Sequence, residues 1–263
     1  MQKLNIDNPF SSMPGTTPGN QPCRSGKAEI YHKEITDSTM NDARELILFN
    51  PPTGTLVVSS EQTAGRGRVK GRKWISAKEE SLMFTMLIKN DDLKFPATFL
   101  PLFAGFAVSG FLESEYGIKS KIKWPNDVLV ERRKISGILC ENSSGYILCG
   151  IGLNCGSFAE KEIAGNSIAS IGEITGVKPD ILQTLTGLLL FMQENWSSNT
   201  WQAALEEKLY MRGENVLLCD GLPESGKRIE GIIIGLGEDG ELVIMEKSTG
   251  KRRHVYSGEI LCK

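Results

Sequence analysis

The sequence predicts an α+β protein that ends in a small all-β domain. Predicted strands occur in clusters flanked by helices, without the regular strand–helix–strand alternation of a parallel sheet. From Asn215 onward the chain changes to short strands separated by glycine-rich turns. The 263 residues, 40% hydrophobic and 24% charged, are enough for a sizeable core.

The first 28 residues favour a flexible lead-in. Four prolines occur there (Pro9, Pro14, Pro18 and Pro22), with little periodic hydrophobicity. The segment is also too short and irregular for a helix-turn-helix. The predicted division is a lead-in over 1–28, a main domain over 29–212 and a C-terminal domain over 213–263.

Hydrophobic periodicity places the elements of the main domain. Apolar residues from Met40 to Ile47 recur at helical spacing behind Asp37 or Ser38, and either side chain can cap that helix. Strands are expected over Glu29–Ile35, Thr55–Ser60, Ser81–Lys89, Lys119–Lys123, Val128–Glu131, Ile135–Glu141 and Tyr146–Leu153. Further helices are expected over Pro96–Tyr116, Pro179–Trp196 and Thr200–Met211.

The C-terminal domain is predicted to contain short strands over Val216–Cys219, Ile229–Leu236, Glu241–Met245, Arg252–Tyr256 and around Ile260. The segment from Gly221 to Lys227 has the glycines and lysine of a phosphate-binding P-loop. However, Arg228 stands where Ser or Thr is required, and a strand follows instead of a helix. We therefore predict an exposed hairpin turn.

The charge balance shows one local excess. The chain has 30 Lys plus Arg, 32 Asp plus Glu and a net charge of −2, which argues against a protein held to nucleic acid by overall charge. Five basic residues nevertheless fall between Arg66 and Lys73, with no acid among them. This concentration predicts a local anion site.

Other classes of protein are disfavoured by composition. No apolar run approaches the roughly 20 residues that span a bilayer, and the N-terminus has no signal core, so we expect a cytoplasmic protein without a membrane partner. The six cysteines form no Cys-x-x-Cys pair, which predicts reduced thiols. The two histidines, His32 and His254, are too few for a histidine-rich metal site.

A glycine- and arginine-rich segment, Gly65–Trp74, follows a predicted strand. Its glycines free backbone N–H groups, and its arginines supply forked donors for phosphate or carboxylate oxygens. It lacks the Rossmann spacing and the helix that should follow. A solvated basic loop or an RNA-binding stretch is the alternative, but the neighbouring Gln62 and Trp74 favour a ligand site.

Three further motifs carry polar groups suited to a site. Lys123–Asp127 combines a rigid turn with Asn126 and Asp127, which can orient a ligand or metal. Lys134 stands at the entrance of an apolar strand, and a solvated strand-end lysine is the alternative. Gly150–Asn154 ends the partner strand with glycines that allow close backbone approach.

In this order, these motifs resemble the biotin–protein ligase family, from about Glu29 to the C-terminus. The resemblance rests on Ser38 and Thr39 opening an early helix, Gln62 with Gly65–Arg68 and Trp74, Lys123–Asp127, Lys134 with Gly137 and Glu141, Gly150–Asn154, and Tyr256–Ile260. It implies an SH2-like mixed-sheet catalytic domain of the class II synthetase/biotinyl-lipoyl ligase type, followed by an SH3-like β-barrel. Two departures are the extra residue at Val69–Lys70 and Met40 where the family commonly has Asn.

The resemblance implies an ATP-dependent ligase that forms biotinyl-5'-AMP and transfers biotin to a lysine of a biotin carboxyl carrier protein, as in acetyl-CoA carboxylase. The substrates would be biotin and ATP with Mg²⁺. Without a helix-turn-helix, no DNA binding or repressor activity is expected. A lipoate–protein ligase is the alternative, although its usual Arg-Arg-x-Ser-Gly-Gly-Gly stretch is absent. Both a monomer and a homodimer through a sheet edge are left open.

The same resemblance implies roles for individual residues, with Lys134 bridging the biotin carboxylate and the α-phosphate. The basic segment would be a lid that is disordered when empty and orders over the ligands. The implied catalytic residues are Lys134, Arg66 and Arg68. The implied biotin-binding residues are Ser38, Thr39, Gln62, Arg66, Gly67, Arg68, Lys134, Gly137 and Gly150. The implied ATP-binding residues are Arg68, Arg72, Trp74, Asn126, Lys134 and Asn154, with Asp127 orienting the Mg²⁺.

Overall fold

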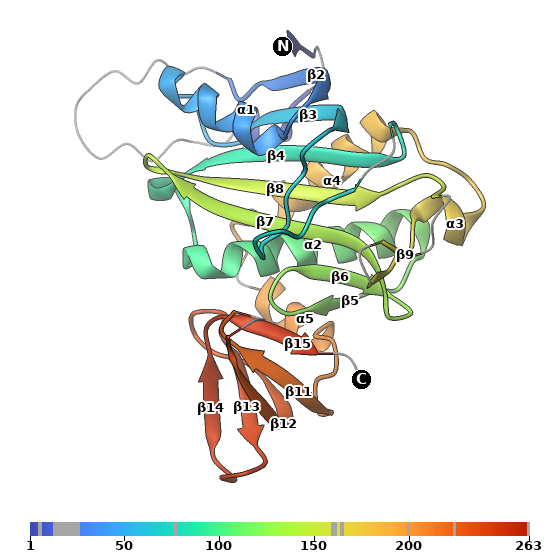
Figure 1. The fold of residues 1–263 in the computed structure, drawn as a ribbon. Helices are drawn as coiled ribbons and strands as arrows, with labels where there is room; N and C mark the ends of the chain where they lie inside the picture. Colours follow the sequence, from blue (N-terminus) through green and yellow to red (C-terminus); the bar gives the residue numbers. More distant parts are fainter. Residues whose placement is uncertain are drawn as a thin grey trace.

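The protein contains two β-sheets with helices packed mainly against the larger one (Figure 1). The computed structural model describes residues 1–4, 7–12, 27–75, 78–158, 162–163, 166–198, 200–222 and 225–261. The α+β prediction is confirmed. The division of the chain into domains at residue 213 stays a prediction.

The large sheet has eight strands in the order β1-β2-β3-β4-β8-β7-β6-β5. Neighbouring strands are antiparallel, except that β2 and β3 are parallel and are joined through helix α1 (Thr39–Leu46). The strands are β1 (Gln2–Lys3), β2 (Ile30–Thr36), β3 (Thr55–Gln62), β4 (Ser81–Lys89), β5 (Lys121–Lys123), β6 (Asp127–Val130), β7 (Arg133–Ser143) and β8 (Tyr146–Asn154). All seven strands predicted for the main domain are therefore present.

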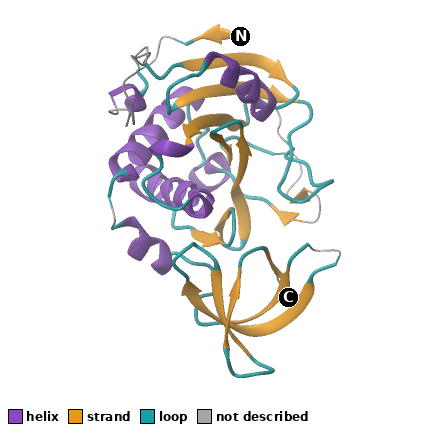
Figure 2. Cartoon of the chain, turned by 90° about the vertical axis from the view of Figure 1, so that its left-hand side faces the viewer, coloured by secondary structure: helices purple, strands orange, loops and turns teal. Residues whose placement is uncertain are grey.

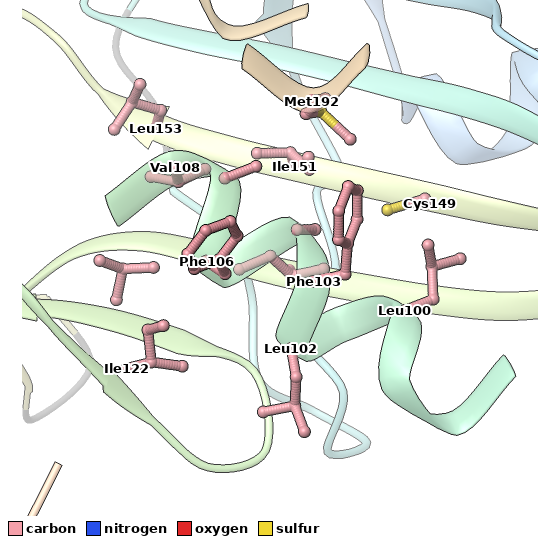
Figure 3. Close-up of a cluster of buried hydrophobic side chains, with 14 of the residues drawn as sticks. Leu100, Leu102, Phe103, Phe106, Val108, Ile122, Cys149, Ile151, Leu153 and Met192 are labelled. Atoms are coloured by element: carbon pink, nitrogen blue, oxygen red, sulfur yellow. The ribbon is translucent and has the colours of Figure 1, made fainter. Parts of the chain in front are cut away.

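The two faces of this sheet have different coverings (Figures 1 and 2). Helices α2 (Leu100–Tyr116), α4 (Ile181–Trp196) and α5 (Trp201–Glu207) form the apolar core with one face. Alternate residues of β8, namely Cys149, Ile151 and Leu153, point into that core, as Figure 3 shows. The intervening Gly150, Gly152 and Asn154 therefore lie on the opposite face, where they line a pocket.

Helix α1 covers part of that opposite face with a small apolar cluster that includes Met40, Ala43 and Leu148. Ser38 is its N-cap, because its hydroxyl accepts a hydrogen bond from the Met40 backbone N–H. Asp37 instead accepts from the Ser38 backbone N–H at 2.6 Å. Of the two caps that the sequence allowed, the structure selects Ser38, which holds the start of the helix beside the pocket.

Helix α2 is the central helix of the core. Together with the preceding turn it forms the segment Ala97–Tyr116, which is long and apolar enough to cross a membrane, and 67% of the segment's most apolar part is buried. The expectation that no apolar run reaches that length is therefore wrong. Its burial against the sheet explains its composition, and Gly117 ends it with φ 66°.

The second sheet has five antiparallel strands in the order β14-β13-β12-β11-β15. Asp220 pairs with Lys227, so the P-loop-like segment is a hairpin connection, as predicted. Within the described residues no pairing joins the outer strands β14 and β15, and the sheet is not closed into a hydrogen-bonded barrel. The strands are β11 (Asn215–Asp220), β12 (Lys227–Leu236), β13 (Leu242–Glu246), β14 (Arg252–Val255) and β15 (Gly258–Leu261).

Several short elements were missed by the sequence patterns, because two to five residues show no periodicity. Helix α5 also ends at Glu207, before the predicted Met211, since the following backbone pairs with Ile122 of β5. The missed elements are β1 (Gln2–Lys3), β9 (Glu162–Ile163), β10 (Asn166–Ser167), α3 (Ile171–Thr175) and the 3₁₀ turns Pro9–Ser12 and Asn90–Asp92, whereas the 3₁₀ turns Ile47–Phe49 and Ala97–Phe99 fall where helices were predicted.

The described part of the N-terminal segment is packed on the main domain. Gln2–Lys3 forms strand β1 along β2. Phe10 is 2% exposed, and its ring meets the edge of Trp196 in α4. The expected flexible lead-in needs correction at these residues, because an apolar anchor outweighs the prolines around it. Residues 13–26 lie outside the described residues.

Candidate active site

One pocket lies between the N-terminus of α1, strands β3, β4, β7 and β8, the turn between β5 and β6, and the segment Gly65–Trp74. Its empty space, including the open mouth, is about 1320 Å³. The structure brings together in its lining every site residue that the sequence predicted. These are Ser38, Thr39, Gln62, Arg66, Gly67, Arg68, Arg72, Trp74, Asn126, Asp127, Lys134, Gly137, Gly150 and Asn154.

Gln62 connects the start of α1 to the pocket. Its side-chain oxygen accepts hydrogen bonds from the Thr39 backbone N–H at 2.8 Å and from the Thr39 hydroxyl at 3.2 Å. The same hydroxyl also contacts the Thr85 hydroxyl at 2.8 Å. These bonds fix the Gln62 amide, so its NH₂ group lies toward Met83 and the glycine-rich segment.

Two glycines form a flat part of the pocket floor. Gly137 of β7 and Gly152 of β8 are directly paired, and the Trp74 indole lies on them. A Cβ on Gly152 would stand 2.5 Å from the Trp74 ring, and one on Gly137 would stand 3.1 Å from it. Only glycine leaves room for the ring at this distance. The buried indole Nε1 has no hydrogen-bond partner among the described residues.

Lys134 lies beside this floor near the start of β7. Its ammonium nitrogen is 2.6 Å from an Asp127 carboxylate oxygen and 5.8 Å from the centroid of the Trp74 ring. The Lys134 and Asp127 side chains are 27% and 25% exposed. The ammonium group is therefore held by a carboxylate and an aromatic ring, and it still faces the open pocket.

The two asparagines of the predicted ATP site use their amide donors on the backbone. Asn126 donates to the Ile138 carbonyl at 2.7 Å. Asn154, which is buried, donates to the Ala169 carbonyl at 3.0 Å and to the Lys134 carbonyl at 3.3 Å. Asn154 thus uses both of its amide hydrogens on the backbone and has only its side-chain oxygen for a ligand, whereas Asn126 has one amide hydrogen and its oxygen for a ligand.

The segment Gly65–Trp74 is a short hairpin. The Gly67 N–H donates to the Arg72 carbonyl at 2.8 Å, and the Trp74 N–H donates to the Gly65 carbonyl at 3.0 Å. The extra residue of the sequence, at Val69–Lys70, falls in the turn of this hairpin, where Gly71 has φ 85°. A longer turn leaves the pairing below it intact, because the added residue extends only the exposed tip.

Side chains of this hairpin bind the C-terminal sheet. Arg68 donates to the Gly258 carbonyl at 2.7 Å, and Arg72 makes two hydrogen bonds to the Glu259 carboxylate at 2.8 and 2.9 Å. Arg66 instead donates to the Asn41 side chain in α1 at 3.0 Å. The hairpin is thus bound to both α1 and β15 at the mouth of the pocket.

The charge states of these groups reflect their surroundings. Burial lowers the pKa of the Arg68 guanidinium, whereas the bonds from Glu259 raise the pKa of Arg72. Burial acts to raise the pKa of Glu259, but the hydrogen bonds and charge of Arg72 outweigh it, and the pKa of that carboxyl is lowered. Both members of this pair are therefore charged near neutral pH.

Cationic side chains outnumber acidic ones around the pocket. The cations are Arg66, Arg68, Arg72, Lys73, Lys123 and Lys134, and the acids are Asp127 and Glu259. Such a lining attracts polyanions. Within the described part of the chain, no group of three or more His, Cys, Asp or Glu is placed to hold a metal ion.

Sequence reasoning missed some lining residues, among them Met40, Ile75, Phe84, Ile168 and Glu259. Met40 and Phe84 are apolar residues at positions of a helix and a strand that typically face a core. The sequence therefore does not distinguish them from residues that only pack in the core. Glu259 lies inside the Tyr256–Ile260 motif, and an acid there could have been paired with the basic hairpin. Glu259 lies at the pocket because the C-terminal sheet contacts the hairpin there. Local sequence patterns do not predict that contact.

Comparisons with known proteins agree with this architecture. A sequence model of the family described as "Biotin/lipoate A/B protein ligase family" matches residues 33–157. The bifunctional ligase/repressor BirA of Bacillus subtilis is 31% identical over 248 residues, 89% of this chain and 74% of that protein. The biotin--[acetyl-CoA-carboxylase] ligase of Paracoccus denitrificans is 29% identical, over 80% of this chain and 91% of that protein.

Solved structures show the same likeness. The biotin protein ligase of Aquifex aeolicus in complex with biotin and ATP superposes with a TM-score of 0.75 and 29% identity. The match covers 88% of this chain and 97% of that one. Sequence and structure agree over both sheets: the chain belongs to the biotin/lipoate A/B protein ligase family.

Proposed function

We propose that this chain is a biotin–protein ligase, which activates biotin with ATP and transfers it to a lysine of a carrier protein. The observation that carries the proposal is the arrangement of one pocket, in which a basic hairpin faces a glycine floor and Lys134 lies beside that floor. Ligase names among its relatives, and the biotin and ATP bound by the Aquifex aeolicus ligase, support this assignment.

In the proposed first step, a biotin carboxylate oxygen bonds to the α-phosphorus of ATP, and the bond to pyrophosphate breaks. Both reactants are anions, and their repulsion grows as water is excluded. Lys134 would bridge the carboxylate and the α-phosphate, which requires its ammonium to leave or share Asp127. Arg66 and Arg68 would add positive charge at the developing centre. In the second step, the carrier lysine bonds to the biotinyl carbonyl and AMP leaves.

The proposed biotin end of the pocket is the side near α1. Ser38, Thr39 and Gln62 carry the donors and acceptors that a ureido ring requires, and Gln62 is already oriented by Thr39. Gly137 and Gly150 would let the bicyclic ring and its tail approach the strands, which requires the Trp74 ring and the Met40 side chain that lie against these glycines to shift. Gly67 would contribute a backbone group from the hairpin.

The proposed ATP end lies toward the C-terminal sheet. Trp74 offers a ring for the adenine, and Arg68 and Arg72 offer charge for the phosphates, with Asn126 and Asn154 at the strand ends. Mg²⁺ would enter with the nucleotide, since it prefers phosphates and water to an all-protein cage. Asp127 is the acid placed to orient it, next to Lys134.

The proposed acceptor is a biotin carboxyl carrier protein, as the names of the acetyl-CoA-carboxylase ligases indicate for those relatives. A cytoplasmic location is part of the proposal. Monomer and sheet-edge homodimer remain open alternatives.

The test is transfer itself. The purified chain is incubated with ATP, Mg²⁺ and a carrier domain, with biotin in one reaction and lipoate in another, and the carrier is weighed by mass spectrometry. We expect one biotinyl group on one lysine, and no lipoyl group. Transfer of lipoate in place of biotin would favour the alternative ligase, and no transfer of either would refute the proposal.

A further inference from the structure

The turn between β12 and β13 reaches the active-site motif Lys123–Asp127 from the other sheet. The buried Trp124 indole, 3% exposed, donates its N–H to the Gly240 carbonyl at 3.1 Å. Trp124 also lines the pocket, whereas Gly240 does not. We infer that this hydrogen bond makes Gly240 a positioning residue for the nucleotide end of the active site; the inference rests on the proposed function.

Gly240 is constrained from both sides of this contact. Its φ of 79° is a conformation that side-chain-bearing residues rarely adopt. A Cβ there would also stand 3.2 Å from Phe99 and 3.3 Å from Leu102, which are buried at the start of α2. The carbonyl that accepts from Trp124 is therefore fixed by backbone conformation and by close packing on the main sheet's helix.

Trp124 transmits this position to the pocket through a short turn. The Asn126 N–H donates to the Lys123 carbonyl at 3.1 Å, and Asn126 exchanges two hydrogen bonds with Ile138 of β7. The next residue, Asp127, is the carboxylate that holds Lys134. If the indole moved, the turn would rotate about these bonds, and the Asn126 and Asp127 side chains would move with it.

This contact is distinct from the hairpin contacts of Arg68 and Arg72, because it reaches the fixed turn of the main sheet and involves no charge. A purely structural role predicts lower stability with unchanged kinetics in the folded fraction. A positioning role predicts a larger rise in the KM for ATP than in the KM for biotin, because Asn126 and Asp127 of the turn lie at the proposed nucleotide end, whereas biotin meets the turn only through Lys134.

The test compares two pairs of variants in biotin-dependent ATP–pyrophosphate exchange. Trp124→Phe removes the donor and keeps a ring. Its control, Trp201→Phe, makes the same substitution at another buried Trp, which is 1% exposed and packs edge-on against the Phe99 ring. The Trp201 N–H has no hydrogen-bond partner in the described part of the chain, so no such bond is lost.

Gly240→Ala is matched by Gly250→Ala in the same sheet. Gly250 has φ 66°, but a Cβ there would meet no atom within 4 Å. Urea unfolding of all four variants gives the folded fraction at the assay temperature. The Gly250→Ala control measures the effect of backbone strain alone, and the Trp201→Phe control measures the effect of removing part of a buried ring. Any further effect in Gly240→Ala or Trp124→Phe therefore comes from loss of the contact between Gly240 and Trp124.

We expect Trp124→Phe and Gly240→Ala to raise the KM for ATP by roughly fivefold to tenfold, as loss of one buried hydrogen bond would. The KM for biotin should change less than about twofold, and both controls should leave both KM values unchanged. Equal effects in variant and control, or equal effects on both substrates, would overturn the positioning role. Absence of exchange by the unsubstituted protein would overturn the proposed function and this inference with it.

Discussion

The floor of the pocket and the hairpin beside it are held by different kinds of contact. The floor consists of paired strands, in which Gly137 and Gly152 face each other and the Lys134 carbonyl accepts hydrogen bonds from the Ala169 backbone N–H and the Asn154 side chain. The hairpin is fixed by three arginine side chains that reach α1 and the C-terminal sheet across partly exposed surface. The floor is therefore rigid by fold, whereas the hairpin is held by side-chain hydrogen bonds, one pair of them to a carboxylate, and can be released.

The floor and the hairpin are therefore expected to have different roles in the reaction. A floor built from backbone can hold Lys134 in one geometry throughout turnover. A hairpin held by side-chain hydrogen bonds can exchange its contacts with Glu259 and Gly258 for contacts with ligand phosphates and carboxylate. Substitutions in the floor should accordingly affect the chemical step, and substitutions at the hairpin contacts should affect binding of ATP.

The largest effect is expected at Lys134. Lys134→Ala removes the ammonium group between the two anions and should slow biotinyl-adenylate formation by about a hundredfold to a thousandfold, with biotin binding retained. Pyrophosphate release and calorimetric biotin binding measure the two effects. Lys178→Ala is the control, since Lys178 makes a comparable ion pair with Glu80 outside the pocket. Pyrophosphate release at the normal rate would defeat the role assigned to Lys134.

The next effect is expected on the floor itself. Gly152→Ala places a Cβ 2.5 Å from the Trp74 ring, so the indole must move off the strands. We expect kcat/KM for ATP to fall by about tenfold to a hundredfold, because the displaced ring is next to Lys134. The control is Gly235→Ala, where the atom nearest to the added Cβ is the end of the Glu206 side chain at 3.0 Å. That side chain is flexible and can move aside. Unchanged kinetics in Gly152→Ala would show that the ring position is irrelevant.

A smaller effect is expected at the hairpin contact. Glu259→Gln removes the charge that holds Arg72 away from the ligand, so Arg72 gives up less when it binds the phosphates, and the KM for ATP should fall by roughly threefold to fivefold, with little change in kcat. The effect is modest because Arg72 is about half exposed (48%) and solvent screens the pair. Glu246→Gln, which removes a weaker pairing with Arg253, is the control. A fall in kcat with constant KM would show that the hairpin contact, like the floor, affects the chemical step and not ATP binding.

The smallest effect is a pH dependence of the same contact. The pKa of Glu259 in the folded protein is below its ordinary value of 4.5, so the stability it contributes is present above that value. It is lost as the pH falls through the lowered pKa. The difference in unfolding free energy between wild type and Glu259→Gln should therefore be constant near pH 7 and shrink in acid. A difference that grows in acid would contradict the ion pair.

Much of this pocket could be predicted from sequence, for reasons that differ between the two regions. Gly65–Trp74, Lys123–Asp127 and Gly150–Asn154 are local motifs, and strand pairing brings their residues together once each strand is recognised. The contacts of Glu259 and Gly240 join segments more than 100 residues apart, and no local pattern encodes them. The buried Phe10 was missed because proline-rich composition conceals a single apolar anchor.

The pocket between the hairpin and the glycine floor is proposed to activate biotin with ATP. Exchange of labelled pyrophosphate into ATP, measured with and without biotin, tests it most directly. We predict exchange only when biotin is present, and loss of nearly all of it in Lys134→Ala but not in Lys178→Ala. Exchange that does not depend on biotin, or equal exchange by both variants, would contradict the claim.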